Sequence, residues 1–376
     1  MIKRTMPVAL SALLVTMTSV HAHTLYEEGN KKLELTGKVL LERHFSKDKA
    51  ADGDQSALRL GLKGEAPLDE KDPAIKLFAQ LELGKGLTAD PIAVRTAVVG
   101  VKGDEIGTLS YGRTLGVMND VTAFTSELPV ACSEALGNDA DRFGTGRATG
   151  LLQYRTPKVQ GVQLALQYLA KNGSEDSKEP LKHKDKKLQK SNGDGYGLAL
   201  THEIGHGVTW GMAFNNEAKS RQQKDQFFND KRATMLALGA KYDSERFYVG
   251  GTYAETRNQL FFTDKDLDRK FGVDQQPEKG IYANKTQGFE IVAQYKLPNG
   301  LKPTVGYLQS TATLKDDRYE TKEKNVQFID VGAVYELSKQ FSVSADYKIN
   351  LLKQKKAEKL GASAENILGV GLTYTF

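Results

Sequence analysis

The chain has 376 residues, a formal net charge of +5 and one cysteine, Cys132. No intramolecular disulfide can form, which excludes a disulfide-stapled secreted fold, and the mild positive charge does not call for a nucleic-acid partner. With 36 glycines, 10 prolines, 15 tyrosines and 15 phenylalanines, the composition favours many strands joined by tight turns over a helical protein.

Residues 1–22 have the pattern of a secretory signal peptide. Two basic residues precede an apolar stretch at 6–20, and Ala22 closes a short segment of the kind that a signal peptidase cuts. The apolar stretch is too short to span a bilayer as a helix. We predict cleavage after Ala22, which leaves residues 23–376 as one domain.

Apolar and polar residues then alternate in one segment after another. The clearest alternating segments are 33–39, 58–62, 161–169, 208–214, 289–296 and 343–350. A strand with this period has one apolar and one water-facing side. Transmembrane barrels are built from such strands, so they lack the ~20-residue apolar runs of membrane helices. No run of that length occurs after residue 22.

Short turns and long polar stretches alternate along the chain. The predicted turns are 69–72, 103–106, 157–161, 243–246, 298–300 and 338–340, and the predicted loops are 172–195, 216–232, 257–286, 311–325 and 353–365. Only a closed sheet pairs every backbone group within lipid, and such barrels have short turns at one end and long loops at the other. The pattern therefore predicts an all-β, antiparallel transmembrane β-barrel.

The last nine residues alternate up to the final aromatic pair, Tyr374 and Phe376. An aromatic chain end would fray into solvent in an ordinary soluble domain. We therefore predict that this strand pairs with the first long strand, 31–45, and closes the barrel.

Several segments resemble the enterobacterial general diffusion porins, and the resemblance covers nearly the whole chain after residue 22. The segments that carry it are 26–38, 59–65, 111–116, 164–172, 191–195, 253–258, 283–287 and the terminal strand. The resemblance implies a trimeric, 16-stranded barrel in the cell outer membrane, with its third loop folded inward. It also implies passive diffusion of ions and small hydrophilic solutes, and recognition of Tyr374 and Phe376 by the outer-membrane assembly machinery.

Alternation places Lys38, Arg59 and Arg147 on the water-facing side of their strands, whereas Arg95 falls on the same side as apolar residues. In the family that the chain resembles, the matching positions form a ladder of cations at the narrowest point of the pore. Glu82 matches an acidic position on the same wall. The alternative is that these cations are only solvated side chains in a wide lumen.

The inward loop is expected between residues 113 and 142. The acidic positions of the family motif fall on Ser126 and Val130, so Glu127 is the candidate acidic group, followed by Glu134, Asp139 and Asp141. Two opposite charges about 8 Å apart at an effective dielectric near 20 interact by roughly 2 kcal/mol. Fewer acidic groups opposite the ladder lead to the hypothesis of a preference for anions.

Other readings remain open. His202-Glu-Ile-Gly-His206 matches the zinc-peptidase signature, but that chemistry needs a helix, and the flanking alternation with Gly205 and Gly207 favours a turn between strands. The lysine-rich run 178–190 is either a solvated loop or a contact for lipopolysaccharide phosphates at the outer-membrane lipid surface. The alternatives in function are a substrate-selective, anion-preferring porin of the same fold, an exported zinc metallopeptidase and a non-conducting surface barrel. No enzyme activity, metal or cofactor is expected.

Overall fold

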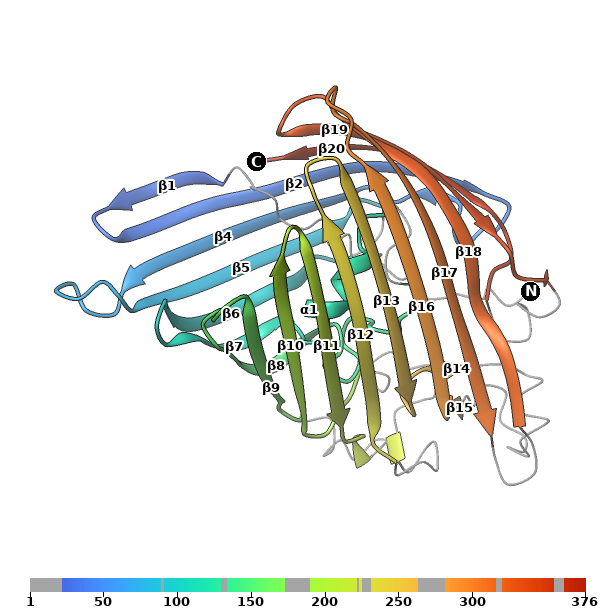
Figure 1. Cartoon of the computed structure of the whole chain (residues 1–376), viewed down its shortest axis with the longest axis horizontal. Helices are drawn as coiled ribbons and strands as arrows, with labels where there is room; N and C mark the ends of the chain where they lie inside the picture. Colours follow the sequence, from blue (N-terminus) through green and yellow to red (C-terminus); the bar gives the residue numbers. More distant parts are fainter. Residues whose placement is uncertain are drawn as a thin grey trace.

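The computed structural model is an antiparallel β-barrel, and Figure 1 shows its strands following one another around the wall in chain order. The structure describes residues 22–88, 91–129, 134–172, 190–221, 223–224, 231–262, 281–315, 320–354 and 362–376. Within these ranges no helix has the length and apolar character needed to cross a bilayer.

The main sheet contains 18 strands, of which the short β1 (His23–Glu28) and β3 (Gly53–Asp54) flank β2, so that sixteen form the closed ring. In chain order the ring strands are β2 (Lys31–Ser46), β4 (Ala57–Pro67), β5 (Lys76–Gly86), β6 (Ala93–Gly103), β7 (Gly107–Leu115), β8 (Arg147–Arg155), β9 (Val162–Leu169), β10 (Gly195–Gly205), β11 (Val208–Glu217), β12 (Ala233–Asp243), β13 (Phe247–Arg257), β16 (Lys285–Tyr295), β17 (Leu301–Lys315), β18 (Glu320–Glu336), β19 (Phe341–Asn350) and β20 (Ile367–Thr375). A separate small hairpin consists of β14 (Phe261–Phe262) and β15 (Ile281–Tyr282). The predicted 16-stranded fold is confirmed.

The last strand closes the ring against the first, as predicted. β20 pairs with β2 from Lys38↔Thr375 to Ser46↔Ile367, and the backbone N–H of Gly37 donates to the Phe376 carbonyl at 2.6 Å. The Phe376 ring covers Gly37 so closely that a Cβ there would lie 2.1 Å from the ring carbon Cζ. Glycine is therefore required at position 37 to seat the terminal aromatic ring.

Strand alternation sets the two faces of the wall. On β4, Leu58, Leu60 and Leu62 point outward and are 39–44% exposed, whereas Arg59 and Lys63 lie on the inner face. Similar exposed leucines, valines and tyrosines occur on every part of the outer surface. An apolar band of this extent would be a liability in water, and lipid is the environment that suits it.

All six predicted short turns lie between consecutive ring strands. The predicted loop 311–325 was wrong, because β17 continues to Lys315 and β18 already begins at Glu320. This stretch alternates Thr with Ala or Leu and Lys with Glu, so it keeps the strand period without an apolar outer face. The polar composition of this stretch was therefore misinterpreted as evidence for a loop.

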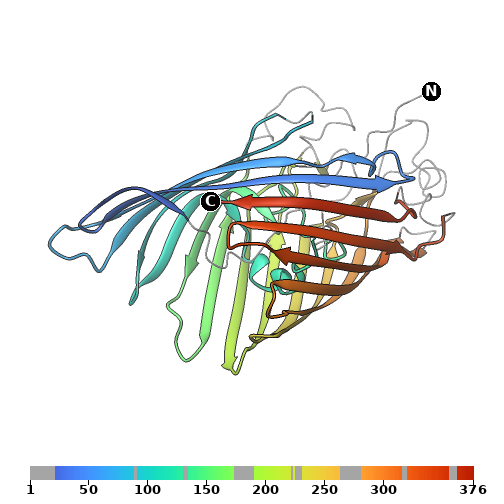
Figure 2. The same cartoon turned by 90° about the horizontal axis from the view of Figure 1, so that it is seen from above.

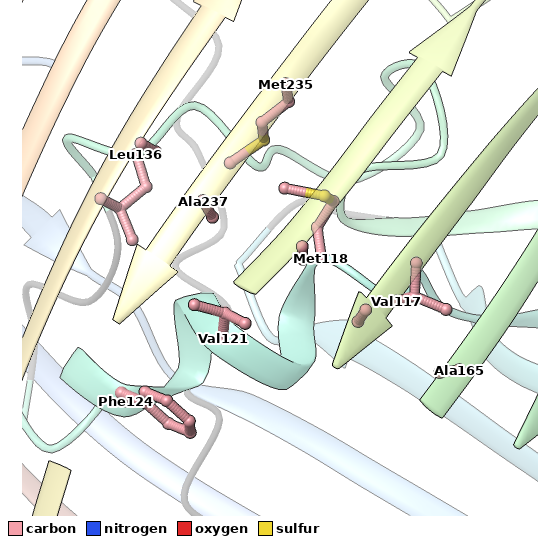
Figure 3. Packing of buried hydrophobic residues seen from close by; sticks show 11 residues of the cluster. Val117, Met118, Val121, Phe124, Leu136, Ala165, Met235 and Ala237 are labelled. Carbon is pink, nitrogen blue, oxygen red and sulfur yellow. The ribbon is translucent and has the colours of Figure 1, made fainter. Parts of the chain in front are cut away.

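The connection between β7 and β8 is the third connection at the loop end, and its described residues, 116–129 and 134–146, turn into the barrel (Figure 2). It contains the short helix α1 (Asn119–Thr122) and the 3-10 turn η1 (Ala123–Thr125). Its apolar side chains Val117, Met118, Val121, Phe124 and Leu136 pack on inner-wall residues of β9 to β13 that are mostly alanines (Figure 3).

The inner wall makes room for this loop with small residues. A Cβ at Gly250 would lie 1.7 Å from the Phe124 carbonyl oxygen, and one at Gly288 would lie 2.0 Å from the Ala135 carbonyl oxygen. Glycine is needed at both positions because the loop backbone touches the wall there. Because these alanines and glycines leave space beside the inner wall, the third loop can pack against the wall and extend into the lumen.

Candidate functional site

Four basic side chains lie on neighbouring strands of one part of the wall. Lys38 on β2 is the cross-strand partner of Arg59 on β4, and Arg59 is in turn opposite Gly84 on β5. Because Gly84 has no side chain, Arg95 from β6 lies across that position, and a Cβ there would be 2.5 Å from Arg95 Cδ. The charge of Arg59 is also influenced by Arg95, Arg147 and Glu82.

A β-bulge gives Arg95 its direction. Glu82 pairs with Thr96 and Leu83 pairs with Val94, so Arg95 is the extra residue between two registered pairs. A bulge turns its extra side chain away from the regular alternation. Arg95 therefore points toward Glu82, and its Nε donates to Glu82 Oε1 at 2.6 Å. The apolar residues that follow Arg95 at two-residue spacing in the sequence therefore lie on the other face of the strand.

Arg147 joins this cluster from β8. Its Nη1 donates to the Arg95 carbonyl oxygen at 3.1 Å and to Thr96 Oγ1 at 2.6 Å. Arg95 and Thr96, the residues at the bulge, thus supply the two oxygen acceptors that bind the Arg147 guanidinium. Lys38, Arg59, Glu82, Arg95 and Arg147 are brought together as a single patch, which we call the wall cluster.

A further arginine that the sequence did not single out lies on β7 beside a second bulge, whose extra residue is on β8. Arg113 falls between Gly112 and Thr114 at a register shift of β7 against β8. Its guanidinium forms an ion pair with Asp141 of the inward loop, and Lys190 Nζ lies 3.4 Å from the same carboxylate. Burial raises the pKa of Asp141, but the hydrogen bond and charge of Arg113, with Lys190, outweigh it and hold the pKa below 3.8.

The inward loop is fixed to the opposite wall. Glu290 on β16 is fully buried and accepts hydrogen bonds from Thr125 Oγ1 at 2.6 Å and from the Ala135 N–H at 3.0 Å. Tyr248 on β13 donates to the Phe124 carbonyl oxygen at 2.9 Å. The loop is therefore attached to the neighbouring strands β13 and β16 at two places, at residues 124–125 and at Ala135.

This attachment decides where Glu127 lies. η1, which ends two residues before Glu127, packs on β12, β13 and β16. In the ring of sixteen these strands lie eight places from β4, β5 and β6, which carry much of the wall cluster. Glu127 therefore comes from the side of the lumen that faces the cluster. Ser126, at the first acidic position of the family motif, is buried.

The other acidic candidates of the loop are engaged in ion pairs. Glu134 Oε2 lies 2.5 Å from Lys348 Nζ on β19, and that ammonium group also lies 4.0 Å from the centre of the Phe328 ring. Asp139 pairs with Arg142 at 2.7 Å. Lys348 shares the polar face of its strand with Asp346, so alternation indicated that it faces the lumen but not that it binds the loop. Val130 and Cys132 lie outside the described residues.

The predicted turn between strands at His202–His206 is confirmed, and the motif does not form the helix that the zinc-peptidase alternative requires. His202 lies in β10, opposite Trp210 of β11, and the chain turns at Gly205–Gly207 before Val208. Trp210 Nε1 donates to His202 Nδ1 at 3.3 Å. Across the described ranges, no three His, Cys, Asp or Glu side chains are grouped so that they could hold a metal ion.

Comparisons with known proteins agree with this architecture. Residues 27–376 match the family model described as Gram-negative porin. Outer membrane porin F of Xenorhabdus nematophila is 38% identical over 98% of both chains, and outer membrane porin PhoE of Enterobacter cloacae is 34% identical over 96% of this chain and 97% of its own. The structure of Salmonella typhi OmpF in complex with daunomycin matches with a TM-score of 0.79 and 30% identity, covering 94% of this chain and 100% of that one.

A closed sixteen-stranded barrel with an apolar outer face and a charged lumen defines a channel-forming protein of the outer membrane. The chain belongs to the Gram-negative porin family. An anion-selective porin from Comamonas acidovorans has the same fold, with a TM-score of 0.64 at 17% identity.

Proposed function

We propose that the protein lets ions and small hydrophilic solutes diffuse passively through its lumen, and that the wall cluster and the inward loop form the constriction. The observation that carries this proposal is the pairing of a cationic patch on β2, β4, β6 and β8 with a loop that Glu290 anchors to β16, which lies eight places from β6 in the ring. The lumen narrows between these two features, so a passing solute meets charge on both sides.

The cluster acts on solutes through its local field. Opposite charges about 8 Å apart at an effective dielectric near 20 interact by roughly 2 kcal/mol, which is enough to orient a dipolar solute. Screening over about 8 Å at physiological salt confines this field to the constriction. A hydrated solute would therefore be aligned only as it passes the loop.

The charge balance supports a preference for anions within this general diffusion. Glu82 is paired with Arg95, while Arg147 donates to two neutral oxygens. Among the acidic loop residues, Glu134, Asp139 and Asp141 are already paired with basic groups. The wall cluster thus contains four basic residues, Lys38, Arg59, Arg95 and Arg147, against one acidic wall residue, Glu82, with Glu127 of the loop on the facing side. Such a preference is graded and does not require a dedicated solute site.

Reversal potentials in planar bilayers under a salt gradient test this proposal. The unchanged protein should favour anions, and the double variant Arg59→Gln/Arg147→Gln should shift the reversal potential toward cations. Lys302→Gln/Lys296→Gln, which removes two charges at the turn end, is the matched control and should leave the reversal potential unchanged. A strong cation preference of the unchanged protein would refute the assigned charge balance.

Several further properties belong to the same proposal. We infer a homotrimer, removal of residues 1–22 on export, delivery by the outer-membrane assembly machinery through the strand ending in Tyr374 and Phe376, and contact with lipopolysaccharide. We also infer that the protein has no catalytic activity and needs no cofactor. A trimer of barrels should give conductance that rises in three equal steps, and mass spectrometry of the exported protein should find His23 at its N-terminus.

A further inference from the structure

A histidine and a glutamate lie side by side on the inner face of β2, between the wall cluster and the loop end of the strand. The pairing of β2 with β20 has no register shift after Lys38, so Glu42 and His44 follow Lys38 on the same face. Leu41 and Phe45 alternate with them on the outer face, where they are 47% and 48% exposed. Glu42 and His44 therefore line the lumen.

The two side chains bring a nitrogen and an oxygen atom to one point. His44 Nε2 lies 2.5 Å from Glu42 Oε1, and the two side chains are 12% and 10% exposed. An imidazole nitrogen and a carboxylate oxygen are ligands of Zn²⁺ and of neighbouring divalent transition metals, which they bind at about 2.0–2.2 Å. Two ligand atoms of a tetrahedral Zn²⁺ ion are about 3.4 Å apart, so an ion that replaces the hydrogen between these groups requires only a small separation of the pair.

Glycines leave space around this pair. His44 is opposite Gly53 of β3 and Gly369 of β20, and Glu42 is opposite Gly371 of β20. None of these three cross-strand neighbours has a side chain that could cover the imidazole or the carboxylate. Zn²⁺ in an open site keeps water as a further ligand, and the glycines leave room for that water beside the pair.

The pair is held on a well-ordered part of the wall. The Glu42 N–H donates to Ser56 Oγ at 3.0 Å, and the Gln55 N–H donates to the Glu42 carbonyl oxygen at 2.8 Å. Ligands on a paired strand keep their relative positions better than ligands on a loop. Lys38, the member of the wall cluster on the same strand, lies about 13 Å from Glu42 at about 3.3 Å per residue, beyond the screening length of about 8 Å at physiological salt. The cluster therefore repels a cation at this pair only weakly.

We propose that Glu42 and His44 bind Zn²⁺ or a similar divalent transition-metal ion, with water completing the coordination. Two protein ligands make a weaker and more readily reversible site than the three or four ligands of catalytic and structural zinc sites. Mg²⁺ and Ca²⁺ prefer oxygen ligands, so the imidazole selects against them. The bound ion adds positive charge to the lumen on the loop side of the wall cluster, and it thereby makes the ion preference of the pore dependent on the metal.

Calorimetric titration of ZnCl₂ into the purified, untagged protein in detergent measures the site directly. His44→Gln should bind one Zn²⁺ per chain fewer than the unchanged protein. Glu42→Gln should bind that ion about 10- to 100-fold more weakly, the range found when a group that supports a metal site is removed. His202→Gln is the matched control, because His202 lies beside Trp210 in the turn-end part of β10, and it should bind as the unchanged protein does. MgCl₂ at the same concentrations should give no difference between the proteins.

Reversal potentials in planar bilayers give a second measurement. Zn²⁺ should shift the reversal potential of the unchanged protein toward anions, and it should leave that of His44→Gln in place. Both variants should keep the heat-dependent shift in gel mobility of the folded barrel, which separates loss of a ligand from loss of the fold.

The site and the proposed diffusion function can fail independently. Equal Zn²⁺ binding by the unchanged protein and both variants would overturn the site, as would Mg²⁺ binding that is lost in the same variants. A protein that conducts but binds no Zn²⁺ at this pair would refute the metal site alone. A protein that binds Zn²⁺ at this pair but passes no current would refute the diffusion function alone.

Discussion

The inward loop should be released when its anchor on β16 is removed. Glu290→Ala takes away the acceptor for the Ala135 N–H and leaves Thr125 Oγ1 with only its 3.4 Å contact to the Thr122 carbonyl oxygen, and both donors remain buried. A buried donor left without an acceptor costs about 1–3 kcal/mol. Loss of both Glu290 contacts, allowing for partial rehydration and for the long Thr122 contact that Thr125 keeps, weakens the loop attachment by about 2–4 kcal/mol, which raises the population of the released loop by about 30- to 700-fold.

Single-channel recording measures this directly, because a mobile loop changes the width of the constriction. Glu290→Ala should show more frequent closures and larger current noise, and Glu290→Gln, which keeps one carbonyl acceptor, should show about half of the free-energy change. Glu245→Ala in the turn between β12 and β13 is the control and should behave like the unchanged protein. If Glu290→Ala gave the same noise and closure frequency as the unchanged protein, the assigned role of Glu290 would be refuted.

Three further variants test other contacts. Gly84→Ala should displace Arg95 and break its 2.6 Å contact with Glu82, which would shift the reversal potential, while Gly64→Ala, whose Cβ would have no neighbour closer than 3.9 Å, should not. Gly37→Ala should unseat Phe376 and lower the thermal midpoint by an amount equivalent to about 1–3 kcal/mol, measured by the heat-dependent shift in gel mobility; an unchanged midpoint would contradict the seating. The pKa of Asp141 lies below 3.8, so its attachment of the loop to Arg113 should be complete above pH 3.8 and be lost as pH falls through the lower folded-state value. Asp141→Asn should reproduce at pH 7 the conductance that the unchanged protein shows only in acid, and identical conductance of the two proteins at pH 7 would exclude this role.

The barrel could be predicted from the sequence because alternation and turn spacing are local properties of the chain. The period of two in 161–169 and 343–350 gave the two faces of β9 and β19, and the terminal aromatic pair gave the closing strand. The strand ends with polar outer faces, β17 from Thr311 and β18 before Asn325, were predicted as a loop, and the short β14 and β15 lie inside the predicted loop 257–286. In these strand ends the two-residue alternation persists without an apolar face, and the polar composition therefore favoured a loop.

The site could be predicted only in part, because its geometry depends on register. Alternation indicates the face of Lys38 and Arg59 but fails at Arg95, where one extra residue in β6 turns the side chain inward. A bulge is a relation between two strands and leaves no mark in a single sequence. The path of the inward loop had a visible signal, since Ala165 and Ala213 interrupt otherwise polar inner faces of β9 and β11. The reason for their small size is evident only from the structure, in which Val117 and Phe124 pack on that part of the wall.

The central claim is that the closed barrel encloses a water-filled path through the membrane. Single-channel recording of the purified, detergent-extracted protein in a planar bilayer tests it most directly. The account predicts discrete, long-lived conductance steps that arrive in groups of three and scale with the salt concentration of the bath. A correctly folded protein that inserts into the bilayer and passes no current would contradict it.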